Sequence, residues 1–157
     1  MAKVSPGRVV VDYDDDLVVF TVGVRVNKFW KVAKWWPVLT AMPKMLRELQ
    51  SDPESGLLDS RIMVGGRVVM VVQYWRSAER LEHFAHSPEH AHRGFWKWFN
   101  RTVKSNGEVG LWHELYRVRA GEYDTSYINM PPYGLAKATG RKAADRTGPD
   151  HEPIDES

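Results

Sequence analysis

The amino-acid sequence predicts an α+β protein with the ferredoxin-like, or split βαβ, fold. One observation is a pair of strand-like runs at residues 16–27 and 108–118. A second is another pair of strand-like runs, residues 57–64 and 67–75, with a Gly-Gly pair between them. Helical spacing of apolar residues occupies the segments on either side of that pair. The resulting order of strand, helix, strand, strand, helix, strand is that of the split βαβ arrangement.

The first predicted strand and the helical region after it differ in the period of their apolar residues. Residues 16–27 form a nearly continuous apolar run rich in Val, which is typical of a strand buried on much of both faces. From residue 28 to residue 50 the apolar residues recur at helical spacing instead. Pro37 and Pro43 interrupt that region, and proline removes a backbone donor inside a helix. We therefore predict two successive helical pieces.

Turn and capping residues place the elements that follow. Gly65 and Gly66 are predicted to form the two-residue turn of a hairpin. Ser77 is placed to cap a short helix. A longer helix is predicted from Ser87 to about Lys104, because Ser followed by Pro suits the first positions of a helix.

The region after the second helix contains two further strand-like runs. Residues 108–118 and 123–129 have strand character and are separated by a turn that contains Gly, so we predict a second hairpin there. The segment Met130-Pro131-Pro132 cannot complete a central ladder, because proline lacks the backbone donor. We predict that it forms a rim or lid over a site.

The length of the chain predicts one domain. A chain of 157 residues is long enough for one globular domain with its own core. Beyond residue 134 the sequence becomes polar, with little apolar surface to bury. We therefore predict one ferredoxin-like domain over residues 1–134 and a mobile polar tail over residues 135–157.

The predicted strands are apolar on both faces, which leaves one face of the sheet to be covered. The helices of a split βαβ fold lie on one face of the sheet only. The most economical cover for the other face is the same face of a second subunit. We therefore predict a homodimer through the sheet faces, which is a dimeric α+β barrel.

Composition narrows the class of protein. The formal net charge is +2, with Lys and Arg mixed among Asp and Glu, so nucleic acid is not expected as a partner. The chain has no Cys, so any metal must be held by His, carboxylate or Tyr. No apolar run resembles a secretory signal or could span a bilayer, which predicts a cytoplasmic protein without a membrane partner. Most of the seven Trp are expected in the core.

Two histidines lie in unlike surroundings. His92 shares a predicted helix face with Phe95, Trp96 and Phe99 at three-to-four spacing. His113 lies in a strand-like run, where period two directs its side chain away from the face used by its two sequence neighbours. Imidazoles on separate elements could face one cavity, one as a metal ligand and the other as an acid or base.

Other charged and metal-binding groups offer alternatives. Arg25 and Arg76 are candidates to anchor a carboxylate or propionate, since guanidinium groups match such anions, and either could equally be a surface charge. Four histidines between residues 83 and 92 could suggest zinc. The aromatic residues that flank them favour a larger organic cofactor.

Several motifs resemble a family of small bacterial monooxygenase-like proteins over roughly residues 8–138. The motifs are Gln73-Tyr-Trp-Arg-Ser-Ala-Glu-Arg-Leu, His92 followed by Phe99-Asn100, Leu111-Trp-His-Glu, and Tyr127-Ile-Asn-Met-Pro-Pro-Tyr-Gly134. The pattern is more distantly similar to that of the haem-containing aldoxime dehydratases, in which a helical histidine precedes a His-Glu pair on a strand. In that family the helical histidine binds the haem iron, and the strand histidine is the distal acid–base residue.

This second resemblance implies a haem b cofactor. It implies that His92, rather than His90, is the metal ligand and that His113 is the catalytic acid–base residue. Glu114, the neighbour of His113 in the His-Glu pair, and Arg25, which is proposed from its guanidinium chemistry and not from the resemblance, are further catalytic candidates. The residues that it places around the haem are Phe95, Trp96, Phe99, Trp112 and Asn129. The implied function is that of a haem-dependent lyase or monooxygenase acting on a small-molecule substrate.

The same residues are compatible with two other functions. One is a cofactor-independent monooxygenase, in which an aromatic pocket holds a phenol-type substrate and His113 is the base. The other is a non-catalytic haem-binding protein.

Overall fold

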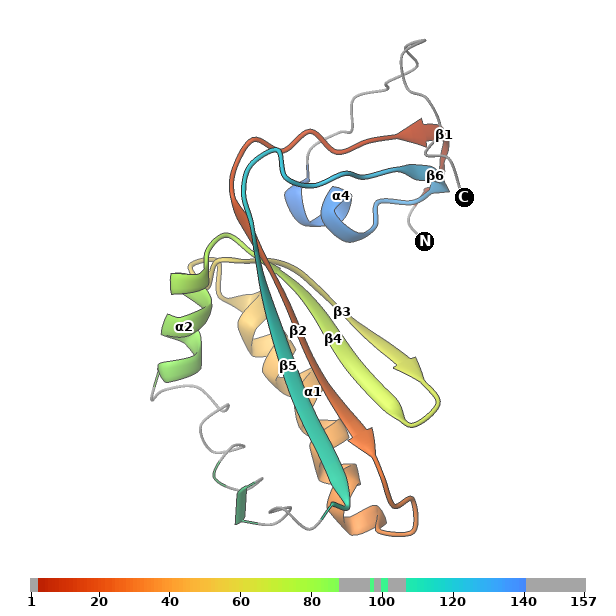
Figure 1. Cartoon of the computed structure of the whole chain (residues 1–157), viewed down its shortest axis with the longest axis vertical. Coiled ribbons are helices and arrows are strands. Elements are labelled where there is room, and N and C mark those ends of the chain that lie inside the picture. Colours follow the sequence, from red (N-terminus) through yellow and green to blue (C-terminus); the bar gives the residue numbers. More distant parts are fainter. Residues whose placement is uncertain (1–2, 88–96, 98–99, 102–106, 141–157) are drawn as a thin grey trace.

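Four antiparallel strands form the main sheet of the protein (Figure 1). This computed structural model describes residues 3–87, 97, 100–101 and 107–140. The spatial order of the strands is β3-β4-β2-β5. Their bounds are Leu17–Val26 for β2, Leu57–Gly65 for β3, Val68–Trp75 for β4 and Val109–Val118 for β5. With α1 between β2 and β3 and α2 between β4 and β5, the predicted ferredoxin-like α+β fold is confirmed.

Two helices, α1 (Val32–Ser51) and α2 (Ala78–His86), cover one face of this sheet (Figure 1). Ser77 caps α2 as predicted, since its side-chain oxygen accepts a hydrogen bond from the backbone N–H of Arg80 at 3.3 Å. Apolar side chains from the helices and from the facing strands make the core. Its largest buried cluster contains Val24, Val38, Met42, Leu46, Val71 and Val109.

The prediction of two helical pieces was wrong, because α1 continues through Pro37 and Pro43. An internal proline costs a helix about 3 kcal/mol. Each buried aliphatic side chain contributes about 1.5–3 kcal/mol in return. The buried stripe of α1, which faces the sheet, is therefore large enough to offset both prolines. It consists of Val38, Met42, Leu46 and Leu49.

The predicted hairpin is present, with its turn shifted by one residue. Gly65 pairs with Val68, so it belongs to the ladder, and the two turn residues are Gly66 and Arg67. Gly66 has a φ of +57°, which a glycine adopts without a steric penalty. The Gly-Gly pair therefore identifies the correct hairpin, but the turn begins one residue later than predicted.

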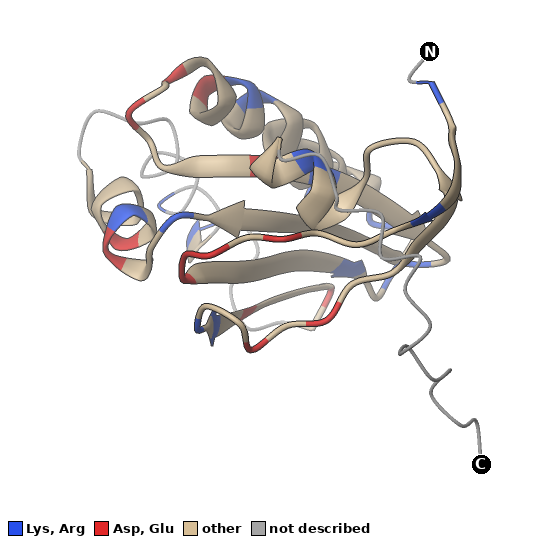
Figure 2. Ribbon diagram, turned by 90° about the horizontal axis from the view of Figure 1, so that it is seen from above, with Lys and Arg blue, Asp and Glu red and all other residues tan. Residues whose placement is uncertain are grey.

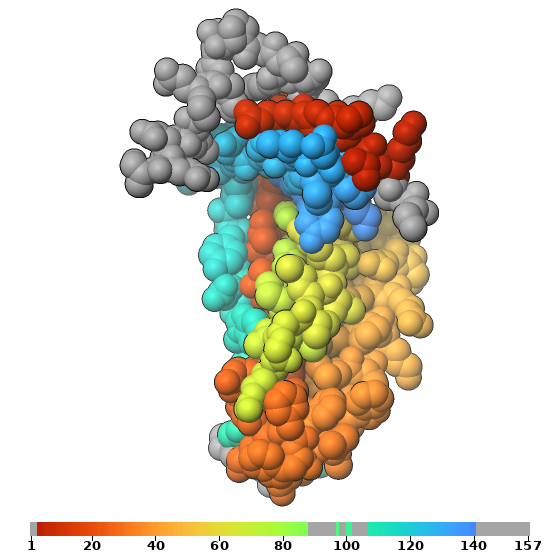
Figure 3. Space-filling model, turned by 90° about the vertical axis from the view of Figure 1, so that its right-hand side faces the viewer, coloured from red at the N-terminus to blue at the C-terminus, as the bar shows by residue number. Residues whose placement is uncertain are grey.

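The predicted second hairpin was wrong. Strand β6 (Tyr127–Met130) pairs with β1 (Ser5–Val9), in a separate two-stranded sheet. Figure 3 shows these two strands side by side across one end of the molecule, beyond the β3–β4 hairpin. β1 was not predicted, because its sequence Ser-Pro-Gly-Arg-Val has little strand propensity and pairs only through this distant partner.

Helix α4 (Gly134–Thr139) extends the fold beyond the predicted domain boundary. Its residue Leu135 is buried in a cluster with Val11 and Leu17, so the boundary at residue 134 is too early. The part of the predicted tail after residue 140 lies outside the described residues. The same holds for most of the helix predicted from Ser87 to Lys104, of which positions 97, 100 and 101 are helical.

Charged residues of both signs are interspersed along the elements (Figure 2). Lys137 Nζ lies 2.8 Å from Asp59 Oδ1, which ties α4 to β3. A longer pair, with Arg117 Nη2 3.9 Å from Glu82 Oε1, connects β5 to α2 at the surface. Within the described ranges, no helix combines the length and the apolar character needed to cross a membrane.

Candidate active site

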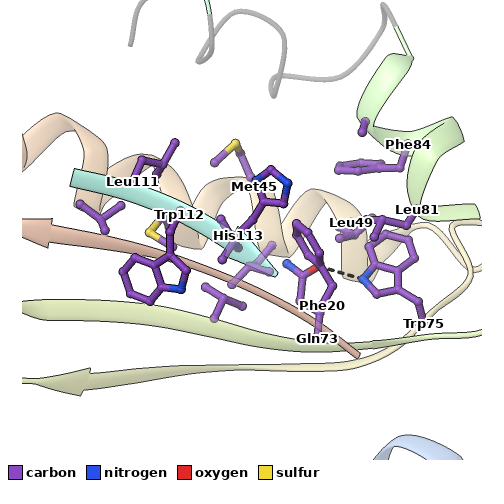
Figure 4. Close-up of a pocket in the computed structure, with 16 residues that line it drawn as sticks. Phe20, Met45, Leu49, Gln73, Trp75, Leu81, Phe84, Leu111, Trp112 and His113 are labelled. Atoms are coloured by element: carbon purple, nitrogen blue, oxygen red, sulfur yellow. Dashed lines mark hydrogen bonds between the residues drawn. The ribbon is translucent and has the colours of Figure 1, made fainter. Parts of the chain in front are cut away.

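A pocket lies between the sheet and the two helices that cover it (Figure 4). Its empty volume is about 860 Å³, a figure that includes space open to solvent. Strands β2, β4 and β5 form one wall, and helices α1 and α2 form the other. The described lining residues are Phe20, Val22, Val24, Met42, Met45, Leu46, Leu49, Val71, Gln73, Trp75, Leu81, Phe84, Ala85, Leu111, Trp112 and His113.

The period of each element explains why these residues meet. Residues two apart on a strand point to one face, so Leu111 and His113 of β5 project together toward the helices. On α1, residues three and four apart share the face that is turned to the sheet. The wall is consequently apolar except where a strand position carries a polar side chain.

Among the described lining residues, His113 is one of two with a polar side chain that faces the pocket. It pairs with Val22 in the β2–β5 ladder, and its ring lies against that of Phe20 with centroids 5.8 Å apart. Strand β5 is the outer strand of the described sheet, and the His113 side chain is exposed. The imidazole can therefore exchange protons with water while it borders an apolar cavity.

Gln73 is the second polar side chain, and the sequence prediction did not select it. It is only 7% exposed, and its Oε1 accepts a hydrogen bond from Trp75 Nε1 at 2.8 Å. Trp75 is fully buried and packs against Phe84, with ring centroids 6.1 Å apart. The available signal was an amide among apolar residues of one strand face, at the start of the motif over residues 73–81.

Glu114 and Trp112 were predicted at the site, but their side chains lie on the other face of the sheet. Trp112 borders the pocket through its place on β5, while its ring covers Gly23, where an added Cβ would overlap the six-membered ring. Glu114 accepts a hydrogen bond from Tyr116 Oη at 2.7 Å, and this bond raises the pKa of Tyr116. The structure therefore does not bring either side chain to His113.

Arg25 and Asn129 are also separated from His113. Arg25 is exposed on the same outer face, where its guanidinium donates a hydrogen bond to Asn27 Oδ1. Asn129 lies in β6, and its Oδ1 accepts a hydrogen bond from Gly7 N at 3.0 Å. Neither residue lines the pocket as described.

The arginine alternative and the predicted lid also lie away from the pocket. Arg76, at the end of β4, is exposed. Met130, Pro131 and Pro132 lead from β6 into α4, so their position does not fit the predicted rim over the His113 pocket.

The remaining predicted site residues lie outside the described part of the chain. These are His92, its alternative His90, and the aromatic residues Phe95, Trp96 and Phe99. Among the residues that are described, no group of three or more His, Cys, Asp or Glu side chains could hold a metal ion.

The fold and the pocket define a class of protein: a ferredoxin-like α+β domain with a largely apolar pocket on the helix side of its sheet. Residues 17–135 match the family described as Monooxygenase af470-like. The match covers most of the chain, and the chain belongs to this family.

A curated relative and two solved structures are similar to the chain. Monooxygenase af470 of Aspergillus fumigatus is 26% identical over 140 residues, which cover 80% of this chain and 49% of the relative. An aldoxime dehydratase in complex with butyraldoxime superimposes with a TM-score of 0.67 at 21% identity, covering 88% of this chain and 40% of that one. A second aldoxime dehydratase gives 0.62 at 23% identity, with 83% and 42% covered.

These similarities differ in what they support. The chain spans about half the length of the curated relative and less than half of the two dehydratases. At these identities, the dehydratase structures establish the shared fold alone.

Proposed function

We propose that the chain is a small-molecule enzyme of the oxygenase or lyase type, with His113 as its acid–base residue. The observation that carries this proposal is that His113 is the only ionisable side chain among the described residues that line the pocket. Imidazole is the side chain best suited to accept and return a proton near neutral pH. The family membership supports the oxygenase class, and the dehydratase fold keeps the lyase class open.

The finer proposal is that the pocket holds a haem whose iron is bound by His92. An apolar wall with one facing imidazole fits the flat, apolar body of a haem. When bound, haem would supply an iron with an open position for a substrate nitrogen or oxygen. Because Arg25 lies on the other face, the proposal gives it no role as a propionate anchor.

The residues of the chain would then hold the substrate and move its proton. The apolar side chains of α1 and β4 would exclude water from the bound molecule. His113 would deliver a proton to an oxygen that leaves, or remove one from the substrate, and would exchange that proton with solvent at the exposed edge of β5.

A cofactor-independent monooxygenase is the second candidate. In the described part of the lining, the aromatic side chains of Phe20, Trp75 and Phe84 could hold a phenol-type substrate. In this scheme His113 removes a phenolic proton, and the resulting electron-rich anion reacts with molecular oxygen.

Absorption spectra separate the two candidates. The chain is expressed with a haem precursor, purified, and compared with His92→Ala and with the control His83→Ala, which removes an exposed histidine of α2. The haem proposal expects a Soret band that His92→Ala loses and His83→Ala keeps. A colourless wild-type protein that binds added haem no better than His92→Ala contradicts it.

The role of His113 is tested by turnover. Butyraldoxime is offered to the reduced, haem-loaded protein, and an electron-rich hydroquinone is offered in air with oxygen uptake as the readout. His113→Ala is expected to lose at least about 100-fold in rate, the usual contribution of general acid–base catalysis, while it keeps any cofactor band. Full activity in His113→Ala on a substrate that the wild type converts would refute the proposal.

A further inference from the structure

We propose that Gln73 is a positioning residue whose amide N–H₂ is the hydrogen-bond donor of the pocket. It would select neutral, largely apolar molecules that carry one acceptor oxygen or nitrogen, such as a carbonyl, an oxime or a phenol. This inference rests on the proposed function only in taking the same pocket as the functional site.

Trp75 fixes which way the Gln73 amide points. An indole N–H can donate a hydrogen bond and cannot accept one, so the amide atom 2.8 Å from Trp75 Nε1 must be the oxygen. The amide nitrogen of Gln73 therefore points the other way, as Figure 4 shows. Because Trp75 is fully buried, it cannot move aside to let the amide turn over.

The Gln73 nitrogen is placed to receive a ligand. In the described part of the chain the Gln73 side chain makes one hydrogen bond, through its oxygen, which leaves the nitrogen without a partner. The nitrogen is not among the fully buried unpartnered atoms of the described residues, and Gln73 is one of the residues that line the pocket. A donor held in an otherwise apolar wall gains most from a ligand that brings its own acceptor.

The rest of the described lining determines what else the ligand must be. No Asp, Glu, Lys or Arg is among the described lining residues, so a charged ligand would lose its hydration without gaining an ion pair from them. Aromatic and aliphatic side chains would contact the remainder of the molecule. The favoured ligand is thus an apolar body with one hydrogen-bond acceptor.

The register of the sheet relates Gln73 to His113. Gln73 pairs with Phe20 from one side of β2, and His113 pairs with Val22 from the other side. The two polar side chains therefore lie on the same face of the sheet, on the two strands that flank β2. They are offset along β2 by two residues, the distance from Phe20 to Val22. A ligand whose acceptor is held by Gln73 would extend its apolar part across β2 toward His113.

A pair of matched probes tests the proposal by binding alone. The probes are 2-acetylnaphthalene, which carries a carbonyl acceptor, and 2-isopropylnaphthalene, which has nearly the same shape and no acceptor. Isothermal titration of the full chain is expected to show about five- to tenfold tighter binding of the acetyl compound, which is the range of one neutral hydrogen bond.

Four variants show which side chain causes the tighter binding of the acetyl compound. Gln73→Leu should remove the preference while it keeps the affinity for the hydrocarbon, and Trp75→Phe should reduce the preference by freeing the amide to turn. The control Gln50→Leu makes the same replacement on the exposed end of α1 and should keep the preference. His113→Phe should also keep it, which separates the donor from the imidazole.

Three results would overturn the inference: equal affinities in the wild type, a preference that survives in Gln73→Leu, or no binding of either probe. If Trp75→Phe does not fold, Gln73→Leu with its control decides the matter. Because no turnover is measured, loss of the acid–base role of His113 would leave this result unaffected, so the two proposals fail separately.

Discussion

The two faces of the main sheet use polar side chains differently. On the helix side, the described pocket wall has two polar groups, His113 and Gln73, and both border open space. On the other side, polar side chains are more frequent and bond to one another, as Tyr116 does to Glu114. The contrast is what we expect if the helix side receives the ligand of the proposed function and the outer face carries the predicted dimer contact.

Other described elements cover the outer face of the sheet at one of its ends. There α4 and its preceding turn cover the sheet, and the guanidinium of Arg61 lies 3.7 Å from the ring centre of Tyr133 and donates to Tyr74 Oη at 3.2 Å. Nε and Nη1 of Arg61 and Oγ1 of Thr21 are buried without a partner. Such atoms cost stability. The described pocket wall has no polar side-chain atom that is fully buried without a partner.

The largest expected effect concerns the uncovered middle of the outer face. Figure 1 shows no described element in front of it, and Met63 and Tyr116 on this face are 45% and 52% exposed. If the predicted homodimer forms through this face, Met70→Glu should abolish it, since a charge would be buried without a partner. Sedimentation equilibrium of the wild type and the variant measures the change.

The matched control for that charge is Val64→Glu, at the end of β3 on the opposite face, where the side chain is 74% exposed. It should leave the dimer intact. A wild-type protein that sediments as a monomer at high concentration, or a Met70→Glu protein that remains a dimer, would rule out the sheet-face assembly.

A smaller effect is expected where the outer face is tightly packed. Gly23→Ala would place a methyl group in the ring of Trp112, and overpacking of this kind costs about 1–3 kcal/mol. Gly110→Ala is the matched control, because the nearest atoms to its Cβ lie 3.7 Å away. Urea unfolding measures both free energies.

The double variant Gly23→Ala with Trp112→Ala identifies the cause. Removing the indole should make the Gly23→Ala change nearly neutral, because the clash is with that ring. An equal cost with and without the indole would show that Gly23 is required for another reason. It would also weaken the assignment of Trp112 to the outer face.

The sequence predicted the positions of the strands and helices better than it predicted which strand pairs with β6. Apolar periodicity located β2 to β5, because buried strands and helices impose it directly. It could not predict that β6 pairs with β1, since Ser5–Val9 carries no such period and is held by a partner far along the chain. The continuous α1 was missed because propensity at a proline does not include the packing of the whole helix.

The candidate site was predicted in part for a related reason. Period two separates His113 from Trp112 and Glu114, and the structure confirms this separation. The resemblance to dehydratases nevertheless grouped all three at one site, because a motif records sequence order and not the face of a strand. Gln73 was missed because its role depends on the hydrogen bond from Trp75, which no spacing rule reveals.

The smallest expected effect is a pH dependence at the covered end of the outer face. Burial raises the pKa of Tyr74 above its usual value of 10.0, the charge of Arg61 opposes this shift, and Tyr127 adds to it. Because the folded pKa is the higher one, the stabilising contribution is fully present below about pH 10, the unfolded value, and is lost as the pH rises through the folded value. Urea unfolding at about pH 9 and about pH 11 should therefore show a smaller loss of stability in Tyr74→Phe than in the wild type. Helix-side variants such as Gln73→Leu should retain the wild-type loss, since they leave Tyr74 in place. Equal losses in Tyr74→Phe and the wild type would mean that Tyr74 ionises as freely in the folded protein as in the unfolded chain, and that α4 does not bury it.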